Sequence, residues 1–130
     1  MSQETASKID LIDHAFFTMA QDDRGFRQAL ILDKETALDQ FQITQEAERR
    51  LEAILQLIDS LTTALVKHWV KERELEPLLA NDQTRRVLLF APKESATYFK
   101  LSKKARNELT NLAEMANAMA EVVFGAGRDT

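Results

Sequence analysis

Two pairs of side chains have the spacing of metal ligands on a helix. Asp10 and His14 are four residues apart, and so are His68 and Glu72. Residues at that spacing lie on one helical face, so each pair could offer two ligands to one ion. A protein site needs more ligands than two, and the chain has only two histidines and no cysteine. We therefore interpret both pairs as solvated surface residues and predict no metal and no other cofactor.

The usual arrangements for covalent catalysis and phosphate binding are absent from the sequence. An activated serine often lies in Gly-x-Ser-x-Gly or Ser-x-x-Lys, and the chain contains neither pattern. Phosphate-binding loops place several glycines between a strand and a helix, whereas Gly125 and Gly127 follow an apolar helical segment. The sequence thus predicts no catalytic residue, and we expect a protein that is not an enzyme.

A basic segment surrounds two aromatic residues near the end of the chain. Tyr98 and Phe99 stand among the cations, which are Lys93, Lys100, Lys103, Lys104 and Arg106. Cations beside aromatic rings can bind phosphates and stack on bases, so Lys100, Lys103, Lys104 and Arg106 are candidate nucleic-acid contacts. The competing interpretation puts both aromatic rings in the core and the lysines in solvent. The net charge of −4 favours this second interpretation.

Composition restricts the class of protein. The 130 residues fit one domain, 1–130, and 45% of them are hydrophobic, which is enough for a core. Residues 1–65 hold 6 basic and 12 acidic side chains, a balance of −6, and residues 66–130 hold 11 and 9, a balance of +2. The absence of cysteine, of a secretory signal and of an apolar stretch of about 20 residues predicts a soluble cytoplasmic protein without a membrane partner.

The polar residues that precede apolar faces predict a mainly α fold, a small bundle of four to five helices with one long central helix. Short helices are expected in residues 7–43, the first with its apolar face on Ile9, Ile12, Phe16 and Met19. Asp22 or Asp23 is expected to cap the second short helix and Asp33 the third. Thr44 is expected to cap the long helix 45–76. Pro77 is expected to stop the long helix.

The segment after Pro77 is rich in β-forming residues. Residues 86–90 and 97–101 flank a turn at Pro92, which predicts a short β-hairpin over 86–101. A helical interpretation stays open, with Pro92 at a helix N-terminus and Tyr98 and Phe99 facing the core. Ser102 is expected to cap a last helix, 103–124, with Gly125 as its stop and residues 125–130 as a tail. We find no internal repeat in the sequence.

Residues 16–55 resemble the helical leader domain of precursors of ribosomally made, enzymatically modified peptides. The matching pieces are Asp22–Asp23, Phe26-Arg27, Leu30 to Asp33, Ala37-Leu38, and Ile43-Thr44 with Glu46. A similar helical unit occurs in the small subunit of protocatechuate 4,5-dioxygenases. Leader domains dock a modifying enzyme, so the resemblance implies that Phe26, Arg27, Leu30, Leu38 and Ile43 shape a docking domain. The chain carries no Cys-, Ser- or Gly-rich core peptide in its last forty residues, which we expect to be folded.

Residues 97–106 resemble the end of a wing and the start of the next helix in winged-helix regulators. Ser102 stands at the position of the usual threonine and Ala105 at that of the usual glycine. This second resemblance implies a small DNA-binding regulator.

Our principal prediction is a non-enzymatic helical docking protein, or adaptor, that binds a protein partner and serves a modifying enzyme or an assembly. A helix over 45–76 is longer than a domain of this size needs, which favours a homodimer through that helix or a further partner. The alternatives are the DNA-binding regulator and an accessory subunit of an enzyme complex.

Overall fold

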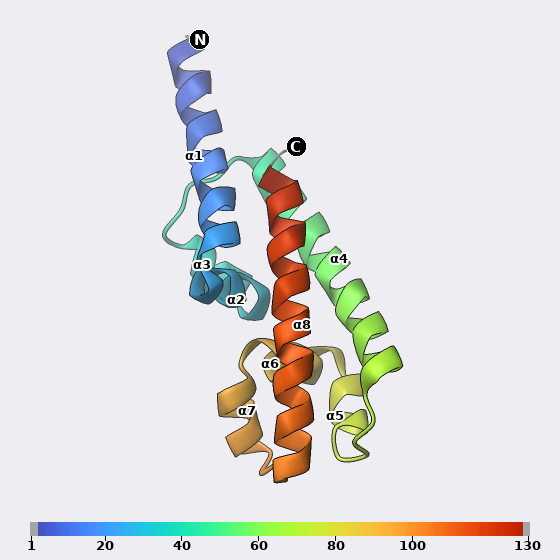
Figure 1. The fold of residues 1–130 in the computed structure, drawn as a ribbon. Coiled ribbons are helices and arrows are strands. Elements are labelled where there is room, and N and C mark those ends of the chain that lie inside the picture. Colours follow the sequence, from blue (N-terminus) through green and yellow to red (C-terminus); the bar gives the residue numbers. More distant parts are fainter. Residues whose placement is uncertain (1–2, 129–130) are drawn as a thin grey trace. The chain divides into compact units, whose positions relative to one another are not determined.

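The computed structural model describes the backbone of residues 3–128 and the side chains of residues 11–126. Within this part, eight helices follow one another (Figure 1): α1 (Gln3–Asp22), α2 (Arg24–Leu32), α3 (Lys34–Leu38), α4 (Gln45–Trp69), α5 (Glu76–Ala80), α6 (Asp82–Phe90), α7 (Pro92–Tyr98) and α8 (Lys103–Arg128). The predicted mainly helical fold with a long helix is confirmed. The predicted number of four to five helices is too low, because α5 to α7 occupy the segment assigned to a connection and a hairpin.

Backbone contacts divide the chain into two compact units. Unit 1 comprises the described parts of residues 1–57 and 121–130, and unit 2 comprises residues 58–120. The two long helices take part in both units: α4 passes from unit 1 into unit 2 after Leu57, and α8 passes from unit 2 into unit 1 after Ala120.

Four of the predicted helix starts are confirmed by side-chain caps. Asp23 Oδ1 accepts a hydrogen bond from Phe26 N at 3.0 Å, and Asp33 Oδ1 accepts one from Thr36 N at 3.4 Å. Thr44 Oγ1 accepts from Ala47 N at 3.1 Å, and Ser102 Oγ accepts from Ala105 N at 3.2 Å. Each cap satisfies an amide that has no partner within its own helix and contributes about 1 kcal/mol.

The long helix ends earlier than predicted. α4 stops at Trp69, and Pro77 lies within the first turn of α5, where a missing N–H costs nothing. A contact from a distant part of the chain explains the early end: the Glu108 carboxylate accepts hydrogen bonds from the amides of Lys71 (3.1 Å) and Glu72 (2.9 Å). These bonds replace the helical partners of the two amides.

The β-hairpin predicted over 86–101 is wrong. No residue between 3 and 128 is in a strand, and the segment forms α6 and α7 instead. Asn81 caps α6 through Thr84 N (3.0 Å), and Leu88, Leu89 and Phe90 are buried along it. Burial on the helical bundle therefore outweighs the β-propensity of these residues. The helical alternative placed Pro92 correctly, at the start of α7, but Tyr98 is 80% exposed and not in the core.

The turn that follows α7 is a Schellman motif built on a lysine. Leu101 N donates to Ala96 O at 3.1 Å and Lys100 N donates to Thr97 O at 3.2 Å. Lys100 has a φ of 53°, in the left-handed region that favours glycine. A side chain in that region costs free energy because its Cβ approaches the following carbonyl.

We expect Lys100→Gly to raise the free energy of unfolding by about 1 kcal/mol, since glycine adopts this φ without the Cβ contact. Urea unfolding followed by circular dichroism measures the change. Lys100→Ala removes the same charge and keeps the Cβ, so its stability should stay close to that of the wild type. A destabilised Lys100→Gly protein would contradict this view of the turn.

Gly125 does not stop the last helix. α8 continues through it to Arg128, and no described glycine has a positive φ. A Cβ at this position would meet the carboxamide of Gln21 in unit 1, so the glycine makes room for that side chain. Of the predicted tail 125–130, residues 129 and 130 lie outside the described part.

The structure reveals an internal repeat that the sequence did not show us. Residues 23–66 (repeat 1) and 81–124 (repeat 2) have the same order of elements, with each residue matching the one 58 positions later. Each repeat has an Asp or Asn cap, a helix of 9 residues, one non-helical linker residue, a short helix and a hydroxyl cap on a long helix. The linkers have similar dihedrals, φ −153° and ψ 79° at Asp33, and φ −141° and ψ 60° at Ala91.

The burial of side chains follows the same register. Ala47 and Ala105, Leu51 and Leu109, and Ile58 and Ala116 are matched pairs that are all at most 1% exposed. Identical residues occupy only five matched positions, Arg27/Arg85, Leu30/Leu88, Phe41/Phe99, Ala47/Ala105 and Leu51/Leu109. The conclusion from the sequence that there is no repeat is therefore corrected by geometry.

Candidate functional site

The five residues predicted to shape a docking domain all belong to repeat 1. Phe26 is half-buried, with its ring centroid 5.6 Å from that of Phe16 and 5.1 Å from that of Phe41. Leu30 is 0% exposed, and Leu38 and Ile43 are half-buried. The ring contacts of Phe26 join α1, α2 and the segment after α3. The contribution of these residues to docking stays a prediction, and most of it would be indirect, through the scaffold.

Arg27, the fifth of these residues, closes the end of α1. Its side chain is 4% exposed, and Nη1 donates to the carbonyl oxygens of Ala20 (3.1 Å) and Gln21 (2.6 Å). Burial lowers the pKa of the guanidinium, and the charge of Glu121 raises it in part. A cation at a helix C-terminus also interacts favourably with the helix dipole.

Arg85 is the matched residue of repeat 2, and it likewise donates to a carbonyl oxygen at the end of the preceding helix. It is 4% exposed, and Nη1 donates to Leu79 O, at the end of α5, at 3.3 Å. Its Nη2 forms an ion pair with Asp82 at 2.8 Å. In both repeats, an arginine four residues after the helix cap reaches back to the preceding helix.

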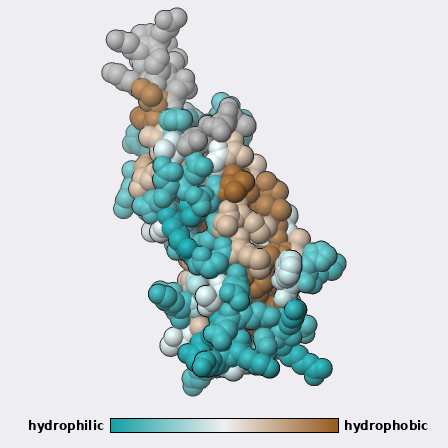
Figure 2. All heavy atoms as spheres, in the orientation of Figure 1, coloured by the Kyte–Doolittle hydropathy of each residue, from teal (hydrophilic) through white to brown (hydrophobic). Residues whose placement is uncertain are grey.

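Unit 1 exposes apolar side chains on helices that bury their other face. Val122 of α8 is 71% exposed and Leu57 of α4 is 48% exposed, although Val123, Phe124 and Ile54 beside them are buried. Figure 2 shows apolar side chains gathered over α4 and the end of α8. On α1, Ile12 (45%) and Met19 (40%) are exposed as well, so they do not lie on a buried face with Phe16 as predicted.

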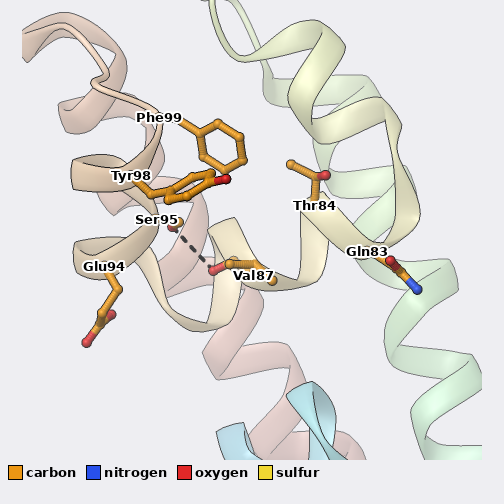
Figure 3. A pocket seen from close by; sticks show the side chains of 7 residues that line it. All are labelled: Gln83, Thr84, Val87, Glu94, Ser95, Tyr98 and Phe99. Carbon is orange, nitrogen blue, oxygen red and sulfur yellow. Dashed lines mark hydrogen bonds between the residues drawn. The ribbon is translucent and has the colours of Figure 1, made fainter.

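Unit 2 contains a groove between α6 and α7 with a volume of about 510 Å³. Figure 3 shows Thr84 and Val87 on the α6 side and Tyr98 and Phe99 on the other side. The rings of Tyr98 and Phe99 are perpendicular, with centroids 5.0 Å apart. The lining consists of Gln83, Thr84, Val87, Glu94, Ser95, Tyr98 and Phe99.

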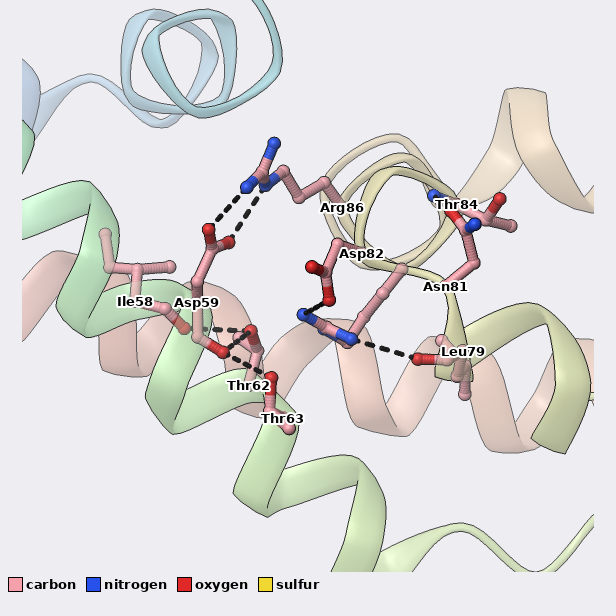
Figure 4. Close-up of polar contacts among 10 residues, drawn as sticks. Ile58, Asp59, Thr62, Thr63, Leu79, Asn81, Asp82, Thr84 and Arg86 are labelled. Carbon is pink, nitrogen blue, oxygen red and sulfur yellow. Dashed lines mark hydrogen bonds and ion pairs between the residues drawn. The ribbon is translucent and has the colours of Figure 1, made fainter.

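Polar contacts in unit 2 hold the walls of the groove in place. Asp59 of α4 accepts two hydrogen bonds from Arg86 of α6, from Nε at 2.9 Å and from Nη2 at 2.5 Å (Figure 4). The hydrogen bond to Asp59 raises the pKa of Arg86. Ser95 Oγ, which is buried at the floor, donates to Ala91 O at 2.7 Å and lies 3.3 Å from Val87 O. The α6 wall is therefore tied to α4 and to α7.

The basic segment lies next to this groove in the chain. Lys93, Lys100, Lys103, Lys104 and Arg106 are all exposed. The last three occupy the first turn of α8, which contains no acidic residue, so the cations add to the positive end of the helix dipole. Residues 91–106 hold five basic and one acidic side chain, a balance of +4 in a chain of net charge −4.

The structure describes the side chains of one of the two metal-like pairs, His68 and Glu72. Between residues 11 and 126, no three His, Asp or Glu side chains are grouped so that they could hold a metal ion. His68 is exposed near the end of α4, and Glu72 lies beyond that end and offers its amide to Glu108. The side chain of Asp10 is outside the described residues.

No described helix is long and apolar enough to cross a membrane.

Sequence reasoning missed the groove because it missed the repeat. A usable signal was present: Arg-x-x-Leu occurs at Arg27 and at Arg85, and Phe-x-Ile/Leu-Thr/Ser occurs at Phe41 and at Phe99, both 58 residues apart. Comparison with known proteins gave no match, whether with protein-family models, curated proteins or solved structures. We therefore compare the matched residues of the two repeats with each other.

Proposed function

We propose that this chain is a helical docking protein that binds a protein partner through exposed apolar side chains. The observation that carries the proposal is the apolar outward side of α4 and α8 in unit 1, at Leu57 and Val122. A helix in a water-exposed bundle usually carries polar residues opposite its buried face, and a group of apolar residues exposed there marks an interaction surface. Ala53 and Ala126, also exposed, belong to the same helices in the same unit.

The aromatic packing of repeat 1 supports this proposal. Its residues that resemble a leader domain form an aromatic and aliphatic scaffold, in which Phe26 and Phe41 contact each other and Phe16 of α1. A scaffold of this kind presents an interface that changes little on binding. The partner can be another protein or a second copy of the chain, and both give the same apolar contact.

We expect Val122→Glu to abolish partner binding without unfolding the protein. The side chain is 71% exposed, so its replacement costs little stability, whereas a carboxylate in an apolar interface must lose its hydration. The measurement combines sedimentation velocity of the purified protein with affinity purification from the native host and mass spectrometry. Leu57→Glu, on α4, should give the same result.

A matched control is Gln56→Glu, which adds the same charge at an exposed polar position next to Leu57. It should keep both the oligomeric state and the co-purifying proteins. If Val122→Glu and Leu57→Glu also kept every specific partner and the wild-type oligomeric state, the docking proposal would be wrong.

A second candidate function, nucleic-acid binding, is favoured by one observation. Tyr98 is 80% exposed and stands in the segment of net charge +4, so a base could stack on its ring while lysines contact phosphates. Binding of a labelled single-stranded oligonucleotide at low salt tests this function. Its affinity should fall steeply with added salt and with replacement of Lys100, Lys103 and Lys104 by Glu.

A further inference from the structure

The groove of unit 2 lies where repeat 1 is filled by one of its own side chains. Thr84 matches Phe26 in the 58-residue register, and Phe99 matches Phe41. In repeat 1 the rings of Phe26 and Phe41 are 5.1 Å apart. In repeat 2 the small Thr84 stands in place of the first ring, and the groove opens beside Phe99 (Figure 3). Thr84 thus leaves space beside Phe99 at the position where repeat 1 has the ring of Phe26.

Three charged positions that follow the first helix of each repeat have opposite signs in the two repeats. Lys93, Lys104 and Arg106 of repeat 2 match Glu35, Glu46 and Glu48 of repeat 1. Lys100 and Lys103 match the neutral Gln42 and Gln45. Repeat 2 therefore combines an open aromatic position with exposed cations, and repeat 1 combines a filled position with exposed acids.

We propose that the α6–α7 groove of repeat 2 binds an acidic segment of a partner protein, which inserts an aromatic side chain beside Phe99. This inference rests on the proposed docking function and names the chemistry of one partner segment. A volume of about 510 Å³ accommodates one aromatic ring together with part of the flanking backbone. Aromatic anchors that enter well-packed pockets are common centres of binding energy in protein interfaces.

The lining of the groove indicates how such a segment would lie. Val87, 41% exposed, and Tyr98, 80% exposed, form apolar edges on the two sides. Glu94 is the one acidic residue of the lining and of residues 91–106, and in Figure 3 its carboxylate points away from Tyr98 and Phe99. Acidic groups of the partner would therefore lie toward Lys100, which follows Phe99 directly in the chain.

A protein segment suits the groove better than a nucleic acid. A base stacks on an exposed ring and needs no recess, so binding of nucleic acid would depend on Tyr98 and the lysines and not on the volume beside Thr84. A side chain that enters the recess depends on that volume. One substitution inside the groove separates the two.

The test is Thr84→Phe, which places in repeat 2 the side chain that repeat 1 has. A display library of random peptides is selected on the wild-type protein, and an enriched peptide is labelled with fluorescein for polarisation measurements. We expect the enriched peptides to share an aromatic residue with several Asp or Glu residues on one side. Thr84→Phe should weaken their binding by at least about tenfold, and Thr84→Ser, the matched control, by less than about twofold.

A second variant protects the test against loss of fold. Val87→Glu changes an exposed edge of the groove, so it should stay folded, and its carboxylate should repel the acidic segment. Thermal unfolding of each variant is measured alongside binding. Replacement of the aromatic residue of the peptide by alanine should reduce affinity as much as Thr84→Phe does.

Three results would overturn the inference. One is the absence of any enriched peptide, and the second is equal binding of the enriched peptides to the wild type and to the folded variants. The third is that a single-stranded oligonucleotide binds wild type and Thr84→Phe alike while no acidic aromatic peptide binds. Because the proposed function is tested in unit 1 with Val122→Glu, its failure and the failure of this groove are distinguishable.

Discussion

Phe26→Asp is expected to lower the free energy of unfolding by about 4 kcal/mol or more, enough to unfold most of the protein at 25 °C. The substitution removes a ring that contacts both Phe16 and Phe41 and leaves a carboxylate beside them. Loss of the aromatic volume and desolvation of the charge act in the same direction. Circular dichroism at 222 nm and urea unfolding measure the effect.

The repeat supplies an unusually close control, Thr84→Asp. Thr84 and Phe26 both lie three residues after a capping Asn or Asp, where a carboxylate suits the helix dipole, so the helical effect of the substitution is the same. Thr84 lines the open groove, and its replacement should change stability by less than about 1 kcal/mol. Equal costs at the two positions would show that repeat 2 has no open space where repeat 1 has Phe26.

Arg27→Ala is expected to cost about 3 kcal/mol of stability, and Arg85→Ala a similar amount. Each substitution leaves buried carbonyl oxygens at the end of a helix without their donor, Ala20 and Gln21 in the first case and Leu79 in the second. Loss of the packed methylene stem adds to the cost. Urea unfolding monitored by circular dichroism gives the two values.

Arg86→Ala is the matched control for Arg85→Ala, because the two arginines are neighbours in α6. The side chain of Arg86 is 37% exposed and its partner Asp59 is 30% exposed, so loss of this ion pair should cost only about 1 kcal/mol. Should Arg85→Ala and Arg27→Ala prove as mild as Arg86→Ala, the closure of α5 and α1 by arginines would not be an important source of stability.

Sequence predicted the helix starts well because a cap is a local interaction. The Asp23, Asp33, Thr44 and Ser102 caps each bind an amide three residues later, so type and spacing suffice to find them. The end of α4 could not be found in this way. It depends on Glu108, which lies 36 residues after Glu72. The prediction assigned the end of the helix to Pro77, whereas the carboxylate of Glu108 binds the amides that follow it.

The α6–α7 segment shows why a short apolar run is ambiguous. Val87 to Phe90 have high β-propensity, and nothing in their order excludes a strand. The helix is favoured by the burial of Leu88 and Leu89 and by the Asn81 cap. The burial depends on the neighbouring helices of the folded protein, which the local sequence does not show. The groove beside Thr84 could not be predicted for a related reason. It forms because Thr84 is too small to fill the space between α6 and α7, and that space is known only from the fold.

The exchange of helix ends between the units has a consequence for how the protein can be divided. Unit 1 contains residues 23–57 of repeat 1 and the last turn of repeat 2, and unit 2 contains the end of repeat 1 together with most of repeat 2. Neither repeat completes a unit from its own residues. Two free copies that traded helix ends in this way would be a domain-swapped dimer, whose assembly depends on concentration. Joining them in one chain makes the exchange intramolecular, so the doubled fold forms at any dilution.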